Sequence, residues 1–314
     1  MIPRKLRRLQ GRQFGTLIGL ILLSVVLTIL TPYFLTVSNL VNVVQQSAII
    51  AIVAAGITFV IISGGIDLSV GSILALGGLV MADALQAGVA VPVAIVVGLL
   101  VGLAAGCVNG LLVTFGRLPP FIATLGTMSA VRGLALMYKD GSPISGFSDS
   151  FRALATGGVM GVPAPVITML IVFVIAHFIL TRTKVGRYAY AIGGNEEGAL
   201  LSGINVRFHK IVVYGISGML SALSAVLLTA RLNSAQPIAA TGYELDAIAA
   251  AVIGGTSLLG GEGTLFGTLI GALIMGVLRN GLNLLNVSSY VQQVAIGAVI
   301  IIAVFVDMAL KRKR

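Results

Sequence analysis

Charged side chains within long apolar segments are the residues of this sequence that could carry chemistry. Because a charge is costly in an apolar environment, it marks a functional site or an ion pair by default. Arg132 and Arg279 lie deepest, and neither can be deprotonated, so neither could relay protons. Asp83 is the one carboxylate in the body of an apolar segment, so any proton transfer would depend on it. The full set is Asp83, Arg132, Arg231, Glu244, Asp246, Arg279 and Asp307.

Sequence signatures of catalysis are absent. No phosphate-binding loop of the G-x-x-x-x-G-K-[ST] type and no G-x-S-x-G nucleophile elbow occurs. His177 and His209 lack metal-ligand spacing, and Cys107 stands alone in an apolar segment, where packing is its expected role. The sequence therefore predicts a chain that is not an enzyme, that does not bind ATP by itself, and that has no cofactor or metal.

The composition indicates that these residues lie in a membrane protein. Of the 314 residues, 57% are hydrophobic and 10% are charged, whereas soluble domains carry about 25% charged residues. Apolar runs long enough to cross a hydrocarbon core recur along the chain. A transmembrane barrel would instead show short alternating segments. We therefore expect one all-α, polytopic membrane domain over residues 1–314.

Hydropathy and helix breakers predict ten transmembrane helices. The third span and the eighth span are the least regular, because polar residues stand at the start of each, and either could be broken or re-entrant. The expected spans are 14–34, 40–62, 68–88, 91–115, 119–138, 165–181, 210–230, 243–259, 264–285 and 290–309.

The distribution of basic residues predicts the topology. Most of the 20 Lys and Arg residues lie before the first span, after the fourth, between the sixth and seventh, and after the last. With ten spans, all four clusters lie on one side, which the positive-inside rule assigns to the cytoplasm. Both termini are therefore predicted to be cytoplasmic. The net charge of +10 is explained by these clusters, so we predict no binding of nucleic acid.

Two loops are long enough for contacts outside the membrane. The loop at 139–164 is predicted to be external, and the loop at 182–210 cytoplasmic. In the latter, Asn195 is a good N-cap, Glu196 and Glu197 suit the start of a helix, and Gly203 suits its left-handed end. This short helix would expose Leu200 and Leu201, either to a groove on a partner protein or to the membrane interface.

Glycines at four-residue spacing allow close packing of helices. They occur in the fourth span at Gly98, Gly102, Gly106 and Gly110, and in the ninth at Gly263, Gly267 and Gly271. Packing within the chain is the plainer interpretation, and a contact with another subunit or a gate is the alternative.

Several long motifs in one order resemble the permease subunits of ATP-binding-cassette importers for ribose and related monosaccharides. The resemblance covers nearly the whole chain. It is carried by Ser-Gly-Gly-Ile-Asp-Leu-Ser in 63–72, Pro-Phe-Ile-Ala-Thr-Leu in 120–125, Gly-Gly-Asn-Glu in 186–206, Tyr-Glu-Leu-Asp-Ala-Ile-Ala-Ala in 234–257, and Gly-Thr-Leu-Ile-Gly-Ala-Leu-Ile in 267–286.

The resemblance implies an architecture and a set of partners. We expect a bundle like that of cobalamin importers, in the inner membrane of a bacterium, with two copies of this chain in contact with lipid. An ATPase subunit and a periplasmic sugar-binding protein would complete the importer. The expected ATPase-coupling residues are Gly193, Gly194, Asn195, Glu196, Glu197, Leu200 and Leu201, and the candidate pathway or gate residues are Gln45, Gln46, Asp67, Asn109, Phe121 and Asn283.

Three rival functions remain at this stage. A proton-coupled sugar transporter would need a titratable carboxylate deep in the bundle, for which Asp83 is the candidate. A passive channel could not move sugar uphill. A structural membrane anchor would leave the external loop and the short helix unexplained. For the 63–72 motif, an ATPase contact, a cytoplasmic gate and a helix break all remain open.

Overall fold

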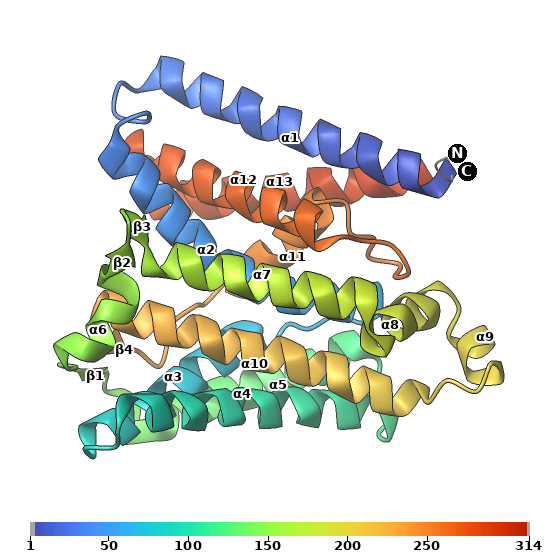
Figure 1. The fold of residues 1–314 in the computed structure, drawn as a ribbon, viewed down its shortest axis with the longest axis horizontal. Coiled ribbons are helices and arrows are strands. Elements are labelled where there is room, and N and C mark those ends of the chain that lie inside the picture. The colour runs from blue at the N-terminus through green and yellow to red at the C-terminus, as the bar shows by residue number, and fades with distance from the viewer. Residues whose placement is uncertain (1–3, 313–314) are drawn as a thin grey trace.

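The computed structural model describes residues 4–312, which form a bundle of helices running roughly along one axis (Figure 1). Short strands and α6 lie at one end of the bundle, and we call this the strand end. Helices α8 and α9 lie at the opposite end, the α9 end, together with the start of α1 and the last turn of α13 (Figure 1). Asp307 and the basic residues before Phe14 lie outside the described side chains.

The elements follow one another along the chain with short connections. They are α1 (Arg4–Leu30), α2 (Val37–Ile62), α3 (Val70–Gln86), α4 (Val91–Thr114), α5 (Pro120–Met137), the 3-10 turn η1 (Tyr138–Gly141), β1 (Ile144–Ser145), α6 (Asp149–Thr156), β2 (Gly158–Val159), β3 (Val162–Pro163), α7 (Ala164–Arg182), α8 (Lys184–Gly194), α9 (Glu196–Leu201), α10 (Val206–Leu232), β4 (Ser234–Ala235), α11 (Tyr243–Ile253), α12 (Leu265–Leu284) and α13 (Ser289–Arg312).

The helical membrane architecture agrees with the sequence prediction. Each predicted span contains a helix, and among the described residues six helices are long and apolar enough to cross a membrane: α2, α4, α5, α7, α10 and α12. Phe14–Leu30, Val70–Gln86 and Ser289–Phe305 are shorter apolar helical stretches. The predicted eighth span is wrong in length, because α11 ends at Ile253 and a Gly-rich loop, 254–264, follows it.

Helix α2 forms the centre of the bundle. Its N-terminus is capped by the Thr36 side chain, and nearly all of its side chains from Ser47 onward are buried among α7, α10, α11 and α12. Asn39 and Asn280 exchange two side-chain hydrogen bonds of 2.9 and 2.7 Å, which join α2 to α12. A helix that is apolar all round is expected at such a position.

Glycines hold α4 against α10. A Cβ added at Gly102 would overlap the backbone of Gly218, and one added at Gly106 would overlap the carbonyl of Tyr214. This close backbone approach supports the interpretation of the four-residue glycine spacing as packing within the chain.

Two of the segments of non-helical backbone that enter the bundle precede a predicted span. The α2–α3 segment (63–69) is largely buried, and α3 begins only after it. The α10–α11 segment (236–242) descends from the strand end, and α11 begins where it ends, beside the first turn of α3. The third and eighth predicted spans are therefore each preceded by a break.

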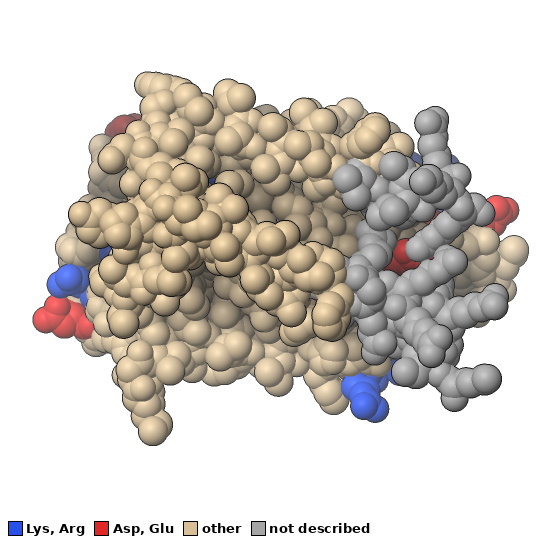
Figure 2. Space-filling model, turned by 90° about the horizontal axis from the view of Figure 1, so that it is seen from above, with Lys and Arg blue, Asp and Glu red and all other residues tan. Residues whose placement is uncertain are grey.

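The surface seen from the α1 side is mostly uncharged. Figure 2 shows Lys, Arg, Asp and Glu gathered mainly toward the two ends of the molecule, with a wide uncharged region between them. This pattern suits a protein whose middle lies in hydrocarbon and whose ends lie in water.

Candidate functional site

Helix α9 has the local structure that the sequence predicts. The Asn195 side chain accepts a hydrogen bond of 2.8 Å from the Gly198 amide, as an N-cap does. Gly203 adopts a φ of +80° just beyond the helix. Leu200 and Leu201 are 62% and 83% exposed. The cap, the left-handed glycine and the exposed leucines are confirmed, and the docking role of this helix stays a prediction.

The two acidic residues of α9 have different environments. Lys210 at the start of α10 forms an ion pair of 2.7 Å with Glu196, which fixes α9 against the bundle. Glu197 is exposed, and it forms no ion pair within the described part of the chain. The exposed surface of α9 therefore includes the unpaired Glu197 and the two leucines.

Immediately before α9, three chain segments meet through glycine backbones. The Gly261 amide donates a hydrogen bond of 2.9 Å to the carbonyl of Ile62, at the end of α2. A Cβ at Gly193 would overlap both of these groups, and one at Gly260 would overlap the Gly193 carbonyl. Gly64 lies in van der Waals range of Gly193. We call this contact between 62–64, Gly193 and 260–261 the glycine junction.

Tyr190 of α8 strengthens the glycine junction from one side. Its hydroxyl donates a hydrogen bond of 2.7 Å to the Gly263 carbonyl in the α11–α12 loop. Burial raises the pKa of Tyr190 to about 12, so the hydroxyl keeps its proton at neutral pH and remains a donor. Through Tyr190 and Gly193, the 182–210 segment is connected to two loops that it does not adjoin in sequence.

A buried polar cluster lies beyond the glycine junction. Asp67 accepts hydrogen bonds from the Ser69 amide at 3.0 Å, the Ser69 hydroxyl at 2.6 Å and the Ser217 hydroxyl at 2.9 Å. The Asn109 amide donates to the Ser69 hydroxyl at 2.7 Å. Asp67, Ser69, Ser217 and Asn109 are fully buried. The cluster ties the α2–α3 segment to α4 and α10, and α5 adds a bond from Thr124 to the Ile66 carbonyl.

The α2–α3 segment is largely buried, which bears on the three interpretations of the 63–72 motif. Because Ser63, Asp67, Ser69 and Ser72 are buried, their side chains are not at the surface of the chain, and Gly64 is the exposed residue. The motif therefore contains the break before α3, and a role as an ATPase contact or as a gate stays a prediction.

The six candidate pathway residues do not form one site. Asp67 and Asn109 share the buried cluster. Gln45 and Gln46 lie on α2, and Phe121 is exposed at the start of α5. The remaining candidate, Asn283 near the end of α12, accepts a hydrogen bond from Gln292. A pathway role for these residues stays a prediction.

The interpretation of Asp83 as a deep carboxylate is wrong. Asp83 lies at the strand end, where it pairs with Lys139 at 2.5 Å and accepts a hydrogen bond of 2.8 Å from the Tyr138 hydroxyl. Its side chain is 36% exposed. Of the deeper charges, Arg279 pairs with the buried Asp246 at 2.5 Å.

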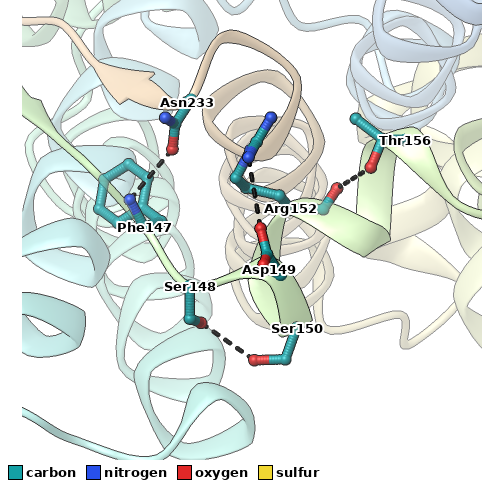
Figure 3. Close-up of polar contacts among 7 residues, drawn as sticks. All are labelled: Phe147, Ser148, Asp149, Ser150, Arg152, Thr156 and Asn233. Carbon is teal, nitrogen blue, oxygen red and sulfur yellow. Dashed lines mark hydrogen bonds and ion pairs between the residues drawn. The ribbon is translucent and has the colours of Figure 1, made fainter.

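The strand end is closed by a small cap built from β1, α6, β2, β3 and β4, which we call the strand cap. Strand β1 pairs with β4, so the predicted external loop joins the chain directly after α10. Asn233, with a φ of +50°, accepts a hydrogen bond of 3.0 Å from the Phe147 amide. Figure 3 shows this bond beside the Asp149–Arg152 pair and the Ser148–Ser150 contact on α6.

The glycine junction was not predicted, although its signal is visible in the sequence. Gly-Gly pairs stand at 64–65, 193–194 and 260–261, in three loops that the predicted topology places on the same side. Comparison of these loops would have suggested that they meet.

Comparison with known proteins gives consistent relatives. Residues 39–304 match the model of the family described as branched-chain amino acid transport system / permease component. The chain is 52% identical to the ribose import permease protein of Bacillus subtilis (strain 168) over 94% of this chain and 92% of that one. It is 51% identical to the ribose import permease protein of Escherichia coli (strain K12) over 93% and 92%.

A relative with another sugar in its name is also similar. The D-allose transport system permease protein of Escherichia coli (strain K12) is 45% identical over 96% of this chain and 93% of that one. No solved structure matches the chain. The family match and the apolar helices identify a multi-pass protein of the bacterial inner membrane, and the chain belongs to the branched-chain amino acid transport system / permease component family.

Proposed function

We propose that this chain is the membrane-spanning subunit of an ATP-driven importer for ribose or a closely related monosaccharide. The observation that carries the proposal is the near-full-length identity of about one half to two ribose import permease proteins. ATP hydrolysis belongs to a partner subunit, and sugar moves by alternating access. The proton-coupled alternative is not favoured by this identity, and its candidate carboxylate, Asp83, is paired with Lys139 at the strand end.

The proposed topology is one domain of ten spans with both termini in the cytoplasm, in a bundle like that of cobalamin importers. In support, the start of α1 and the end of α13 lie at the α9 end (Figure 1). A second copy of the chain and membrane lipid would cover the apolar side chains that the single chain exposes, as on α7 at Leu170, Ile171, Val174, Ile175 and Phe178.

The α9 end is the proposed ATPase side. There Leu200 and Leu201 would enter a groove on the ATPase, and the glycine junction would carry the motion of α9 to the α2–α3 segment. We propose that the periplasmic binding protein docks on the strand cap, because that cap holds the longest loop of the opposite end.

Reconstitution tests the proposed function. The permease would be placed in proteoliposomes with its ATPase and its binding protein, and uptake of radiolabelled ribose would be followed with and without internal ATP. We expect uptake only with all three components and ATP. Uptake by the permease alone, driven by a proton gradient, would contradict the proposal.

A pair of leucine variants tests the docking helix. Leu200→Asp combined with Leu201→Asp places two charges in an apolar contact and should abolish stimulation of the ATPase by loaded binding protein. Leu200→Met with Leu201→Met keeps the surface apolar and should retain stimulation. Membrane insertion, measured by yield of the folded permease, should be the same for both pairs. Normal stimulation in the aspartate pair would show that α9 does not dock.

A further inference from the structure

The α10–α11 segment reaches deep into the bundle from the strand end. Ser234 pairs with Ser145 in the strand cap, and Gln86 at the end of α3 donates a hydrogen bond to the same Ser145. Six residues later, the carbonyl of Ala240 packs on Gly71, in the first turn of α3. Because a helix rises 1.5 Å per residue, Gly71 lies about 22 Å along α3 from Gln86. The segment therefore ends well inside the roughly 30 Å hydrocarbon layer.

This segment is irregular and yet exposed in the single chain. Gln236, Ile238 and Thr241 are exposed, and Ile238 is 64% accessible. Irregular backbone at membrane depth does not face lipid, because its polar groups would lack partners there; it lies against protein or lines a water-filled cavity. The exposed side of the α10–α11 segment therefore does not face hydrocarbon.

Two charged side chains flank the exposed side. Arg132 on α5 donates from Nη1 to the carbonyls of Pro237 and Ala239, at 2.7 and 2.9 Å. Its Nε and Nη2 make no hydrogen bond within the described part of the chain. Glu244 accepts a hydrogen bond from the Gly242 amide through Oε1, and its other oxygen lies beside Gly71. Both side chains are partly exposed.

The backbone of the segment is held in an uncommon conformation. Ala240 has a φ of +55°, in the left-handed region that residues with a Cβ rarely adopt. Such strain persists only where surrounding contacts enforce it, and it concentrates at functional sites. Here Arg132 and the tight contact with Gly71 supply those contacts.

We infer that the α10–α11 segment, with Arg132 and Glu244, lines the water-filled pathway and forms a binding site for the hydroxyl groups of a monosaccharide. Guanidinium nitrogens donate hydrogen bonds and a carboxylate accepts them, while each sugar hydroxyl does both. The pairing of β1 with β4 connects this binding site to the strand cap. The inference rests on the proposed function for the identity of the ligand.

Labelling of single cysteines in the assembled importer tests the inference. The native Cys107 is replaced by alanine, and Thr241→Cys is introduced, with Ile238→Cys as a second variant in case the first does not fold. Val174→Cys on α7, 69% exposed on an apolar helix face, is the matched control. Each complex is placed in nanodiscs and treated with a charged thiol reagent in water, with and without ribose.

We expect rapid labelling at Thr241→Cys or Ile238→Cys, slow labelling at Val174→Cys, and protection by ribose at the first two sites. In Glu244→Gln, the amide oxygen still accepts from Gly242, so labelling without sugar should be unchanged. The ribose concentration that halves labelling should rise about tenfold or more, because a charge-assisted hydrogen bond is lost.

Labelling no faster than at Val174→Cys would show that the segment does not line water and would overturn the inference. Fast labelling that ribose does not slow would overturn the proposed sugar-binding site. The same would follow if the ribose concentration that halves labelling were unchanged in Glu244→Gln. Absence of ribose uptake by the parent complex would instead count against the proposed function, since hydration of the segment is measured without sugar.

Discussion

The two ends of this permease are joined to the bundle in different ways. At the α9 end, the glycine junction brings backbone against backbone, and an added Cβ at Gly193 or Gly260 would overlap neighbouring main-chain atoms. At the strand end, two short strand pairs and the side chain of Asn233 hold the exposed loops of a cap whose Ile144 and Phe151 side chains are buried. Close-packed contacts transmit strain, whereas hydrogen-bonded loops adapt. We infer that the α9 end moves as one body with the bundle and that the strand cap adjusts to its partner.

The largest effect is expected at the glycine junction. Gly193→Ala forces a methyl group into the Ile62 carbonyl and the Gly261 amide, and overpacking costs about 1–3 kcal/mol. ATP-driven ribose uptake in proteoliposomes should fall by about a hundredfold, as the upper part of that range implies.

The neighbouring glycine is a matched control. A Cβ at Gly194 would meet nothing within 4 Å, so Gly194→Ala should retain uptake close to that of the parent protein. Equal losses of uptake in the two variants would show that replacing any glycine in this turn of α8 explains the effect, and not the backbone contact at Gly193.

A comparable loss, of stability and not of uptake, is expected in the Asp67 cluster. Asp67→Ala leaves the Ser69 amide and the Ser69 and Ser217 hydroxyls without their acceptor. We expect the free energy of unfolding to fall by about 3 kcal/mol, since each buried unsatisfied donor costs about 1 kcal/mol or more. Thermal unfolding of the purified permease would measure the loss.

The strand cap supplies the comparison for that variant. Asp149 is 98% exposed and pairs with Arg152, and exposed pairs contribute little to stability. Asp149→Ala should therefore leave the melting temperature unchanged. If it lowered the melting temperature as much as Asp67→Ala, the contrast between the two ends would be wrong.

The smallest effect is expected at Asn233, where two substitutions separate backbone from side chain. Asn233→Gly loses the hydrogen bond to the Phe147 amide but accepts the φ of +50°, at a cost of about 1 kcal/mol. Asn233→Ala adds the left-handed strain, about 1 kcal/mol more. The melting temperature of the permease and the stimulation of its ATPase by the binding protein should both be lower in Asn233→Ala than in Asn233→Gly. Equal values in the two variants would exclude a role for the backbone conformation.

Local chemistry was predictable from the sequence. Asn195 and Gly203 identify both ends of α9 because capping depends on residues within a few positions of the helix end. The apolar runs likewise predicted where helices lie, and the polar starts of the third and eighth spans indicated breaks.

Contacts between distant segments were not predictable in the same way. Asp83 was misinterpreted because hydropathy places a residue within a span but does not show that Lys139 reaches it. The Arg279–Asp246 pair and the meeting of Gly193 with Gly261 join residues far apart in the chain. Hydropathy windows describe composition, and they carry no information on which loops touch.

The central position of α2 has a consequence for biosynthesis. Its main partners, α10 and α12, begin at Val206 and Leu265, long after α2 has left the ribosome. At translation rates of about 5–20 residues per second, α2 waits roughly 10–40 s for α12. During that time lipid or the insertion machinery must shelter it, which its nearly uninterrupted apolar surface allows. The reciprocal Asn39–Asn280 pair then forms late, when the last helices close around a core that was made almost first.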